Sequence, residues 1–192
     1  MTLNFAVIYG SVRSARQGIK YARFLTAQLA ARQHTVTLID PLEYQLPLLD
    51  KMYKEHAPGS APQPLPALAD ILRAADGFLI VSGEYNHSIP PALKNLLDHF
   101  LEEWFWRPSA IACYSAGVFG GVRAAMQLRA TLGELGMPSI PTIHPMPRVH
   151  DQFDDDGTTR DPAHERRVVR FLDEFQWYAA ALKKARAGGV PY

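Results

Sequence analysis

The segment NFAVIYGSVRSARQGIK, residues 4–20, begins as an uninterrupted apolar run and changes at Gly10 into small polar and basic residues. An apolar run without alternation, closed by a glycine, is typical of a strand buried on both faces of a parallel sheet. From about Arg16 to Gln33 the chain carries apolar side chains at helical spacing. A buried strand that leads through a glycine turn into a helix predicts an α/β fold.

The same alternation repeats along the chain. Further strands are predicted at 34–40, 77–83, 109–115 and 137–143. Further helices are predicted at 65–75, 91–103, 122–135 and 164–187. Strands that alternate with helices form right-handed crossovers, and these build a doubly wound parallel sheet. We therefore predict one α/β domain over residues 1–192, a three-layer sandwich whose five-stranded sheet has the order 2-1-3-4-5.

The composition narrows the classes of function. With 192 residues, of which 47% are hydrophobic and 20% charged, the sequence is that of an ordinary globular protein. Its net charge of +1 argues against non-specific binding to nucleic acid or to an acidic lipid surface. The first apolar run is too short for a signal peptide or a membrane span. We expect a cytoplasmic protein that binds no nucleic acid and inserts into no membrane.

Three turns that follow predicted strands stand out in the sequence. They are GSVRSARQG at 10–18, GEYNHSIPP at 83–91 and SAGVFGG at 115–121. In the order 2-1-3-4-5 the three turns are neighbours at the carboxyl edge of the sheet, where ligands of such sheets bind. We therefore predict that the three turns form one site.

The first turn has the chemistry of an anion site. It offers backbone N–H groups at a helix start, the hydroxyls of Ser11 and Ser14, and the cations of Arg13 and Arg16. This set suits a phosphate. It matches neither GxxxxGK[ST] nor GxGxxG, so a nucleoside triphosphate or a dinucleotide at this turn is disfavoured. A capped helix start with solvated arginines is the alternative.

The second and third turns suit a flat molecule. Glu84, Tyr85, Asn86 and His87 are consecutive, so amides can address the edge of a heterocycle while the phenol ring flanks its face. A structural turn with Asn86 in the left-handed conformation is the alternative. The glycines of the third turn allow the backbone to approach a ligand closely, or serve only turn geometry and helix packing.

No residues require a catalytic triad or a metal site. Cys113 lies within a predicted strand, which favours a buried thiol over a nucleophile. His144, His150 and the acidic residues at 151–156 admit a metal site, but such acidic runs usually face water. We therefore predict a solvated loop and no metal.

The chain resembles the NADPH-dependent FMN reductase family, flavodoxin-like proteins that include quinone, chromate and azo-dye reductases. The resemblance rests on GSVR, GEYNHSIPPALKNLLDHF and SAGVFGG after the first, third and fourth strands, and it spans residues 4–143. The second segment is the most specific, because it matches the family pattern PEYN…P…LKN…D. The resemblance implies a flavodoxin-like fold with bound FMN.

The resemblance also implies a role for each turn. Around the FMN phosphate it implies Ser11, Arg13, Gln17 and Gly18, with Arg16 as a further candidate. Along the isoalloxazine ring it implies Glu84, Tyr85, Asn86 and His87, and the pocket is completed by Ser115, Gly117 and Gly120. Many relatives have serine where this chain has Arg16, so the direction of that cation is open.

The implied activity is that of an FMN-dependent NAD(P)H oxidoreductase. In such an enzyme FMN takes a hydride at N5 from NADPH or NADH and reduces a small-molecule acceptor: a quinone, free flavin, azo compound or metal oxyanion. The alternatives are an electron carrier and a flavin-sensing interaction protein without NAD(P)H turnover. Family members are usually dimers or tetramers, so we expect a homodimer or homotetramer. The 41–66 connection and the aromatic residues 104–106 are candidate interface surfaces. For the aromatic residues, a place in the core or in the wall of the cofactor pocket is the alternative.

Overall fold

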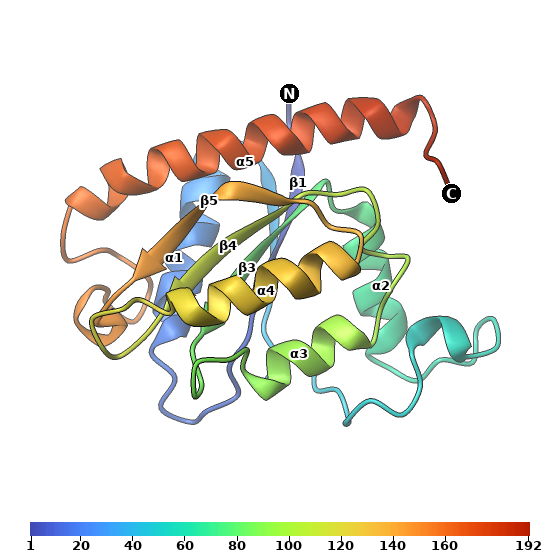
Figure 1. The fold of residues 1–192 in the computed structure, drawn as a ribbon, viewed down its shortest axis with the longest axis horizontal. Helices are drawn as coiled ribbons and strands as arrows, with labels where there is room; N and C mark the ends of the chain where they lie inside the picture. The colour runs from blue at the N-terminus through green and yellow to red at the C-terminus, as the bar shows by residue number, and fades with distance from the viewer.

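The computed structural model describes all residues from 1 to 192. Its strands form one sheet in the order β2-β1-β3-β4-β5, and every neighbouring pair is parallel (Figure 1). The strands are β1 (Asn4–Tyr9), β2 (Thr35–Ile39), β3 (Gly77–Gly83), β4 (Ser109–Tyr114) and β5 (Ser139–Met146). Each residue of the central strand β3 is buried, as expected for an apolar run covered on both faces. The predicted strand order is confirmed.

Helices cover both faces of the sheet (Figure 1). One face carries α1 (Gly18–Ala31) and α5 (Ala163–Ala187), and the other carries α2 (Leu65–Ala74), α3 (Pro91–Asp98) and α4 (Val122–Glu134). Because side chains alternate along a strand, Phe5 and Val7 of β1 enter the core under α1 and α5. Ala6 and Ile8 enter the other core. This arrangement is the predicted flavodoxin-like three-layer sandwich.

Helix α3 is shorter than predicted, because it ends at Asp98 instead of continuing to Glu103. Beyond it the chain folds back, and the indole Nε1 of Trp104 donates to the carbonyls of Leu97 and Phe100, both at 3.1 Å. The indole thus occupies carbonyls that a longer helix would have paired internally. Trp104 is fully buried in the core, so of the alternatives for this residue the core position is the one present.

Strand β5 is longer than predicted, because it continues past Ile143 to Met146 and includes Pro145. It lies at one end of the sheet, so one side of the strand needs no backbone donor. An edge strand therefore tolerates a proline that would interrupt a central one.

The connection between β2 and α2 contains only one short 3-10 helix, η1 (Tyr53–Glu55). The N–H of Tyr53 donates to the carbonyl of His99 at 2.7 Å, and its ring lies 5.8 Å from that of Phe100. This segment therefore packs beside the end of α3, although Leu48 within the connection stays 85% exposed. None of the helices in the chain combines the length and the apolar character that a membrane span needs.

Candidate functional site

A cavity of about 250 Å³ opens at the carboxyl edge of the sheet, where the turns after β1, β3 and β4 meet. Seven of the predicted site residues line it: Ser11, Arg13, Arg16, Gln17, Glu84, Tyr85 and Ser115. The remaining lining residues are Ala15, Gly83, Tyr114, Ala116, Val149 and His150. The strand order thus brings the three turns to one cavity, as the sequence predicts.

The first turn has backbone donors without partners in the protein. The N–H groups from Ser14 to Gly18 donate to no protein acceptor, and no acidic residue stands in the first turn of α1. The side chain of Arg13 is exposed beside them. Free donors at a helix start together with a cation attract an anion. The geometry therefore fits the predicted phosphate site.

Gly18 serves this turn through packing and does not line the cavity. A Cβ at this position would lie 2.1 Å from Cζ of Tyr114, so the phenol ring occupies the space that any larger residue would need. The hydroxyl of Tyr114 donates to that of Tyr9 at 3.3 Å. Burial raises the pKa of both phenols, which keeps them neutral. The floor of the cavity is therefore aromatic and uncharged.

The second turn is a tight reversal between Tyr85 and Ser88, whose backbones exchange hydrogen bonds of 3.0 and 2.9 Å. Its central residues, Asn86 and His87, both have left-handed backbones with φ of 50° and 64°. The amide of Gln127 on α4 donates to the carbonyl of His87 at 2.9 Å. Asn86 and His87 are exposed and do not line the cavity. The structural reversal that the sequence offered as an alternative is therefore present.

A side-chain contact joins the first and second turns. The hydroxyls of Ser11 and Tyr85 share a hydrogen bond of 3.0 Å across the cavity. Ser11 is buried, whereas Tyr85 is partly exposed. The phenol of Tyr85 therefore points toward the first turn.

Glu84 directs its carboxylate at a helix start. Its Oε2 accepts the backbone N–H groups of Arg123 and Ala124 at 3.0 and 3.3 Å. The guanidinium of Arg123 lies 3.4 Å from Oε1. A carboxylate at the N-terminus of a helix satisfies free donors and complements the helix dipole. Glu84 therefore fastens the second turn to α4, and its charge is compensated there.

Two glycines of the third turn, Gly117 and Gly120, lie outside the cavity lining. Gly120 has φ of +64°, and a Cβ there would lie 3.0 Å from Cβ of Pro145. The carbonyl of Gly117 accepts the N–H of Arg148 at 3.0 Å. Both glycines therefore fit the third turn against the end of β5.

A fourth segment, absent from the predicted site, also reaches the cavity. Val149 and His150, in the 3-10 helix η2 (Val149–Asp151), line it. The N–H of Val149 donates to the carbonyl of Ser115 at 3.1 Å, which attaches this segment to the third turn. Ligands of such sheets bind beyond the carboxyl ends of the strands. A prediction in which β5 continued past Ile143 would therefore have included this segment.

The remaining candidate groups lie apart from the cavity. Cys113 is fully buried, and its burial raises the pKa of the thiol to about 12, which makes it inert. In the acidic loop Asp154 and Asp155 form exposed ion pairs with Arg160 and Lys20, each with a separation of 2.8 Å. No three His, Cys, Asp or Glu side chains are grouped so as to hold a metal.

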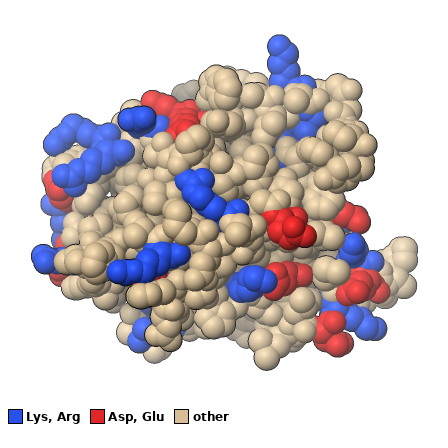
Figure 2. All heavy atoms as spheres, in the orientation of Figure 1, with Lys and Arg blue, Asp and Glu red and all other residues tan.

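Figure 2 shows one face of the molecule with its charged side chains. Basic side chains predominate on the left, over the end where β4 and β5 terminate, while both signs alternate on the right. A positive field near the carboxyl edge of the sheet favours the approach of anionic ligands.

Comparisons with known proteins agree with this geometry. Residues 3–151 match the family model described as NADPH-dependent FMN reductase. A quinone reductase of Pseudomonas putida is 30% identical over 180 residues, which cover 88% of this chain and 91% of the relative. An NAD(P)H-dependent FMN reductase of Schizosaccharomyces pombe is 34% identical over 155 residues, 74% of this chain and 72% of the relative.

A solved structure supports the fold. The structure of FerB from Paracoccus denitrificans, described as a flavoenzyme NAD(P)H:(acceptor) oxidoreductase, superposes with a TM-score of 0.76. It covers 94% of this chain and 98% of its own, with 23% sequence identity. At this identity the likeness concerns the arrangement of the sheet and its helices.

Proposed function

Since the chain belongs to the NADPH-dependent FMN reductase family, we propose that FMN binds in the cavity with its phosphate at the first turn. The isoalloxazine ring lies along the second turn, and the third turn closes the pocket. The chain is accordingly an oxidoreductase that uses FMN and NAD(P)H. One observation supports this placement of FMN. Three turns line the same cavity, and the first of them has backbone N–H groups without protein acceptors.

The residues present fit this cofactor. A phosphate dianion needs donors and positive charge, and the N–H groups of Ser14 to Gly18 with the exposed Arg13 supply both. The cavity contains one carboxylate, that of Glu84, and Arg123 compensates its charge. Repulsion of the phosphate is therefore small.

When bound, FMN supplies hydride acceptance from the nicotinamide and two-electron transfer to the acceptor. The chain contributes placement. Ser11, Arg13, Gln17 and the unpaired N–H groups hold the phosphate, Gly18 leaves room for the floor formed by Tyr114, and Tyr85 flanks the ring. Asn86 and His87 form the rim of the second turn, while Ser115, Gly117 and Gly120 shape the third. No side chain has to transfer a proton for these roles.

The acceptor that we propose is a quinone or a similar small flat molecule. The relatives named as quinone reductases support this class. Both NADPH and NADH stay candidates for the donor, because the exposed cations near the cavity can serve either the FMN phosphate or a nucleotide phosphate. The alternative of an electron carrier would require that NAD(P)H leave the bound flavin oxidised.

We further propose that the protein is a homodimer or homotetramer in the cytoplasm. Several apolar side chains are exposed near the cavity and along α4: Val12, Val118, Phe119 and Met126. Exposed apolar surface of this kind favours contact with a second copy. Gel filtration should therefore give at least a dimer, and a fully active monomer would contradict a shared site.

Spectroscopy of the purified protein tests the function. Bound FMN should give the flavin absorption bands, NADPH should bleach them without oxygen, and a quinone should restore them. Arg13→Ala should weaken FMN binding without weakening riboflavin binding, because riboflavin lacks the phosphate. Arg170→Ala, which removes an exposed arginine of α5, is the matched control. A protein that takes up no FMN would overturn the proposal.

A further inference from the structure

Arg16 lines the cavity, but its guanidinium is paired with a carboxylate of the protein. Its Nη1 and Nη2 form a two-pronged ion pair with Asp40, which follows β2, and Nη2 lies 2.6 Å from Oδ2. The two side chains are only 14% and 7% exposed. A bidentate pair removed from water holds both partners in one geometry.

Arg16 also contacts the start of its own turn. Nη1 donates to the carbonyl of Ser11 at 3.2 Å, and the guanidinium lies 5.4 Å from the centre of the Tyr9 ring. The side chain therefore reaches back across the turn from residue 16 to residue 11. The donors that could meet a phosphate lie between these two points.

The charge of Arg16 is already compensated. Its hydrogen bonds to Asp40 raise the pKa of the guanidinium, so Arg16 stays positively charged. If Nη1 and Nη2 turned from Asp40 to a phosphate, they would leave Asp40 as a buried, unpaired carboxylate, which is costly. Arg13 faces no such competition, because its side chain is exposed.

Asp40 connects this ion pair to the strap, defined as residues 41–49. Its Oδ1 accepts the N–H of Leu42 at 3.0 Å. Further along the strap, Asn95 of α3 accepts the N–H of Leu49 at 2.9 Å and donates to the carbonyl of Pro47 at 2.8 Å. The strap is thus held at its start by Asp40 and near its end by α3.

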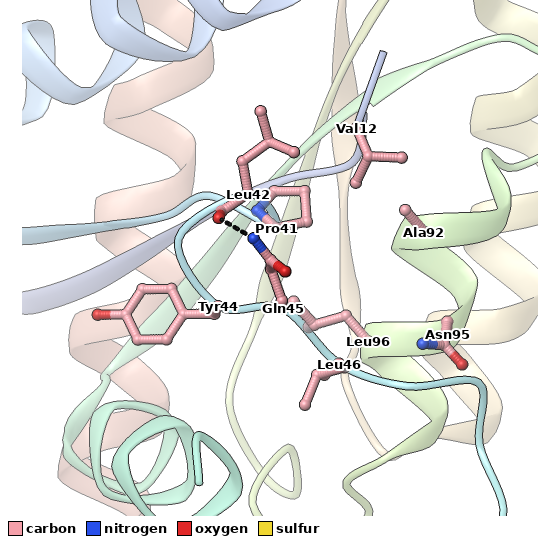
Figure 3. Close-up of a pocket in the computed structure, with 9 residues that line it drawn as sticks. All are labelled: Val12, Pro41, Leu42, Tyr44, Gln45, Leu46, Ala92, Asn95 and Leu96. Atoms are coloured by element: carbon pink, nitrogen blue, oxygen red, sulfur yellow. Dashed lines mark hydrogen bonds between the residues drawn. The ribbon is translucent and has the colours of Figure 1, made fainter. Parts of the chain in front are cut away.

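A hollow of about 330 Å³ separates the strap from α3 (Figure 3). Val12 of the first turn lies on one side of it, Ala92 and Leu96 of α3 on another, and Leu42 on the strap. Since side chains do not fill this space, direct packing between Val12 and the strap does not fix the turn. The ion pair is the polar connection between the first turn and the start of the strap.

We propose that Arg16 and Asp40 form a latch that holds the first turn in the conformation that accepts the FMN phosphate. Arg16 is then a positioning residue and not a phosphate ligand. The part that concerns FMN rests on the proposed function, whereas the ordering of the turn by the latch does not.

Binding of FMN to the apoprotein separates a latch from a ligand. Arg16→Ala and Asp40→Ala should each weaken FMN binding about tenfold, within the range of couplings between neighbouring residues. The double variant should bind no more weakly than either single variant, because both changes open the same latch. Asp98→Ala breaks the more exposed Lys94–Asp98 pair on α3 and serves as the matched control.

Hydrogen exchange of the apoprotein gives a readout without cofactor. Both single variants should speed exchange at Gly10 and Arg13, whose N–H groups donate to the carbonyl of Val81 and the hydroxyl of Ser11, and Asp98→Ala should not. If Asp40→Ala leaves FMN affinity unchanged or raises it while Arg16→Ala lowers it, Arg16 is a direct ligand and the latch is refuted. If the wild-type protein binds no FMN, the proposed function fails, and unchanged exchange in both variants would separately refute the latch.

Discussion

Acid should destabilise this protein through His144, a buried residue of β5. Its Nδ1 is hydrogen-bonded to the hydroxyl of Tyr21, inside the core beneath α1 and α5. Burial lowers its pKa from 6.5 to about 4, with smaller contributions from His164 and Arg167. In the unfolded chain the same side chain titrates near its ordinary pKa. Protons therefore bind the unfolded state first.

The size of the effect follows from the gap between the two pKa values. Well above pH 6.5 His144 is neutral in both states, and its contribution to stability is fully present. As the pH falls from 7 to 5, protonation of the unfolded chain should lower the free energy of unfolding by about 2 kcal/mol. The figure depends little on the native pKa, because at pH 5 the native imidazole is still mostly neutral. The loss levels off below the native pKa of about 4.

Urea unfolding at pH 7, 6 and 5 measures this contribution. The variant His144→Asn has no titrating group at this position, so its free energy of unfolding should fall less with pH, by about 2 kcal/mol over the interval. His150→Asn removes a histidine whose side chain is exposed and should keep the wild-type pH dependence. If wild type and His144→Asn lose stability in parallel, the imidazole is not buried neutral and the reasoning is wrong.

Three further changes have defined outcomes. Gly18→Ala should lower the melting temperature and weaken FMN binding, because the new Cβ would lie 2.1 Å from the ring of Tyr114; addition of Tyr114→Ala should restore part of the loss, and an unperturbed single variant would contradict this packing. Glu84→Ala should cost about 1–2 kcal/mol in denaturant unfolding, because it strips the acceptor from two N–H groups of α4; Glu84→Gln keeps an acceptor and should cost less, so equal losses would argue against the cap. Cys113 should resist Ellman's reagent in the native protein and react once urea unfolds it, since burial raises its pKa to about 12; rapid native reaction would show that β4 opens.

Much of the fold could be predicted from the sequence, because buried parallel strands are continuous apolar runs. The strand order then follows from connection rules, and with it the meeting of the three turns. The ends of elements were harder to predict. The end of α3 depends on the indole of Trp104, which returns from beyond the helix to take its carbonyls. No pattern within the helix itself carries that information.

The sequence predicts which turns line the cavity, but it does not predict the ion pairs and hydrogen bonds that their side chains form. The residues of the first turn can be read as an anion site from their types alone. The partner of Arg16 is Asp40, which follows β2 and lies 24 residues further along the chain, so sequence proximity does not reveal the pair. Glu84 likewise turns to the start of α4, which is remote in sequence. Long-range pairing therefore decides which charged residues of a candidate site remain free for a ligand.

The reversal at Asn86 and His87 sets stability against the proposed role of His87 in the FMN site. Asparagine adopts a left-handed backbone readily, whereas most other residues with a side chain pay roughly 1 kcal/mol for it and glycine pays nothing. A screen that rewards only thermal stability should therefore tend toward glycine at position 87. Such a protein would lose the exposed imidazole of the second turn. Libraries built to stabilise this chain should accordingly hold residue 87 fixed until its part in turnover has been measured.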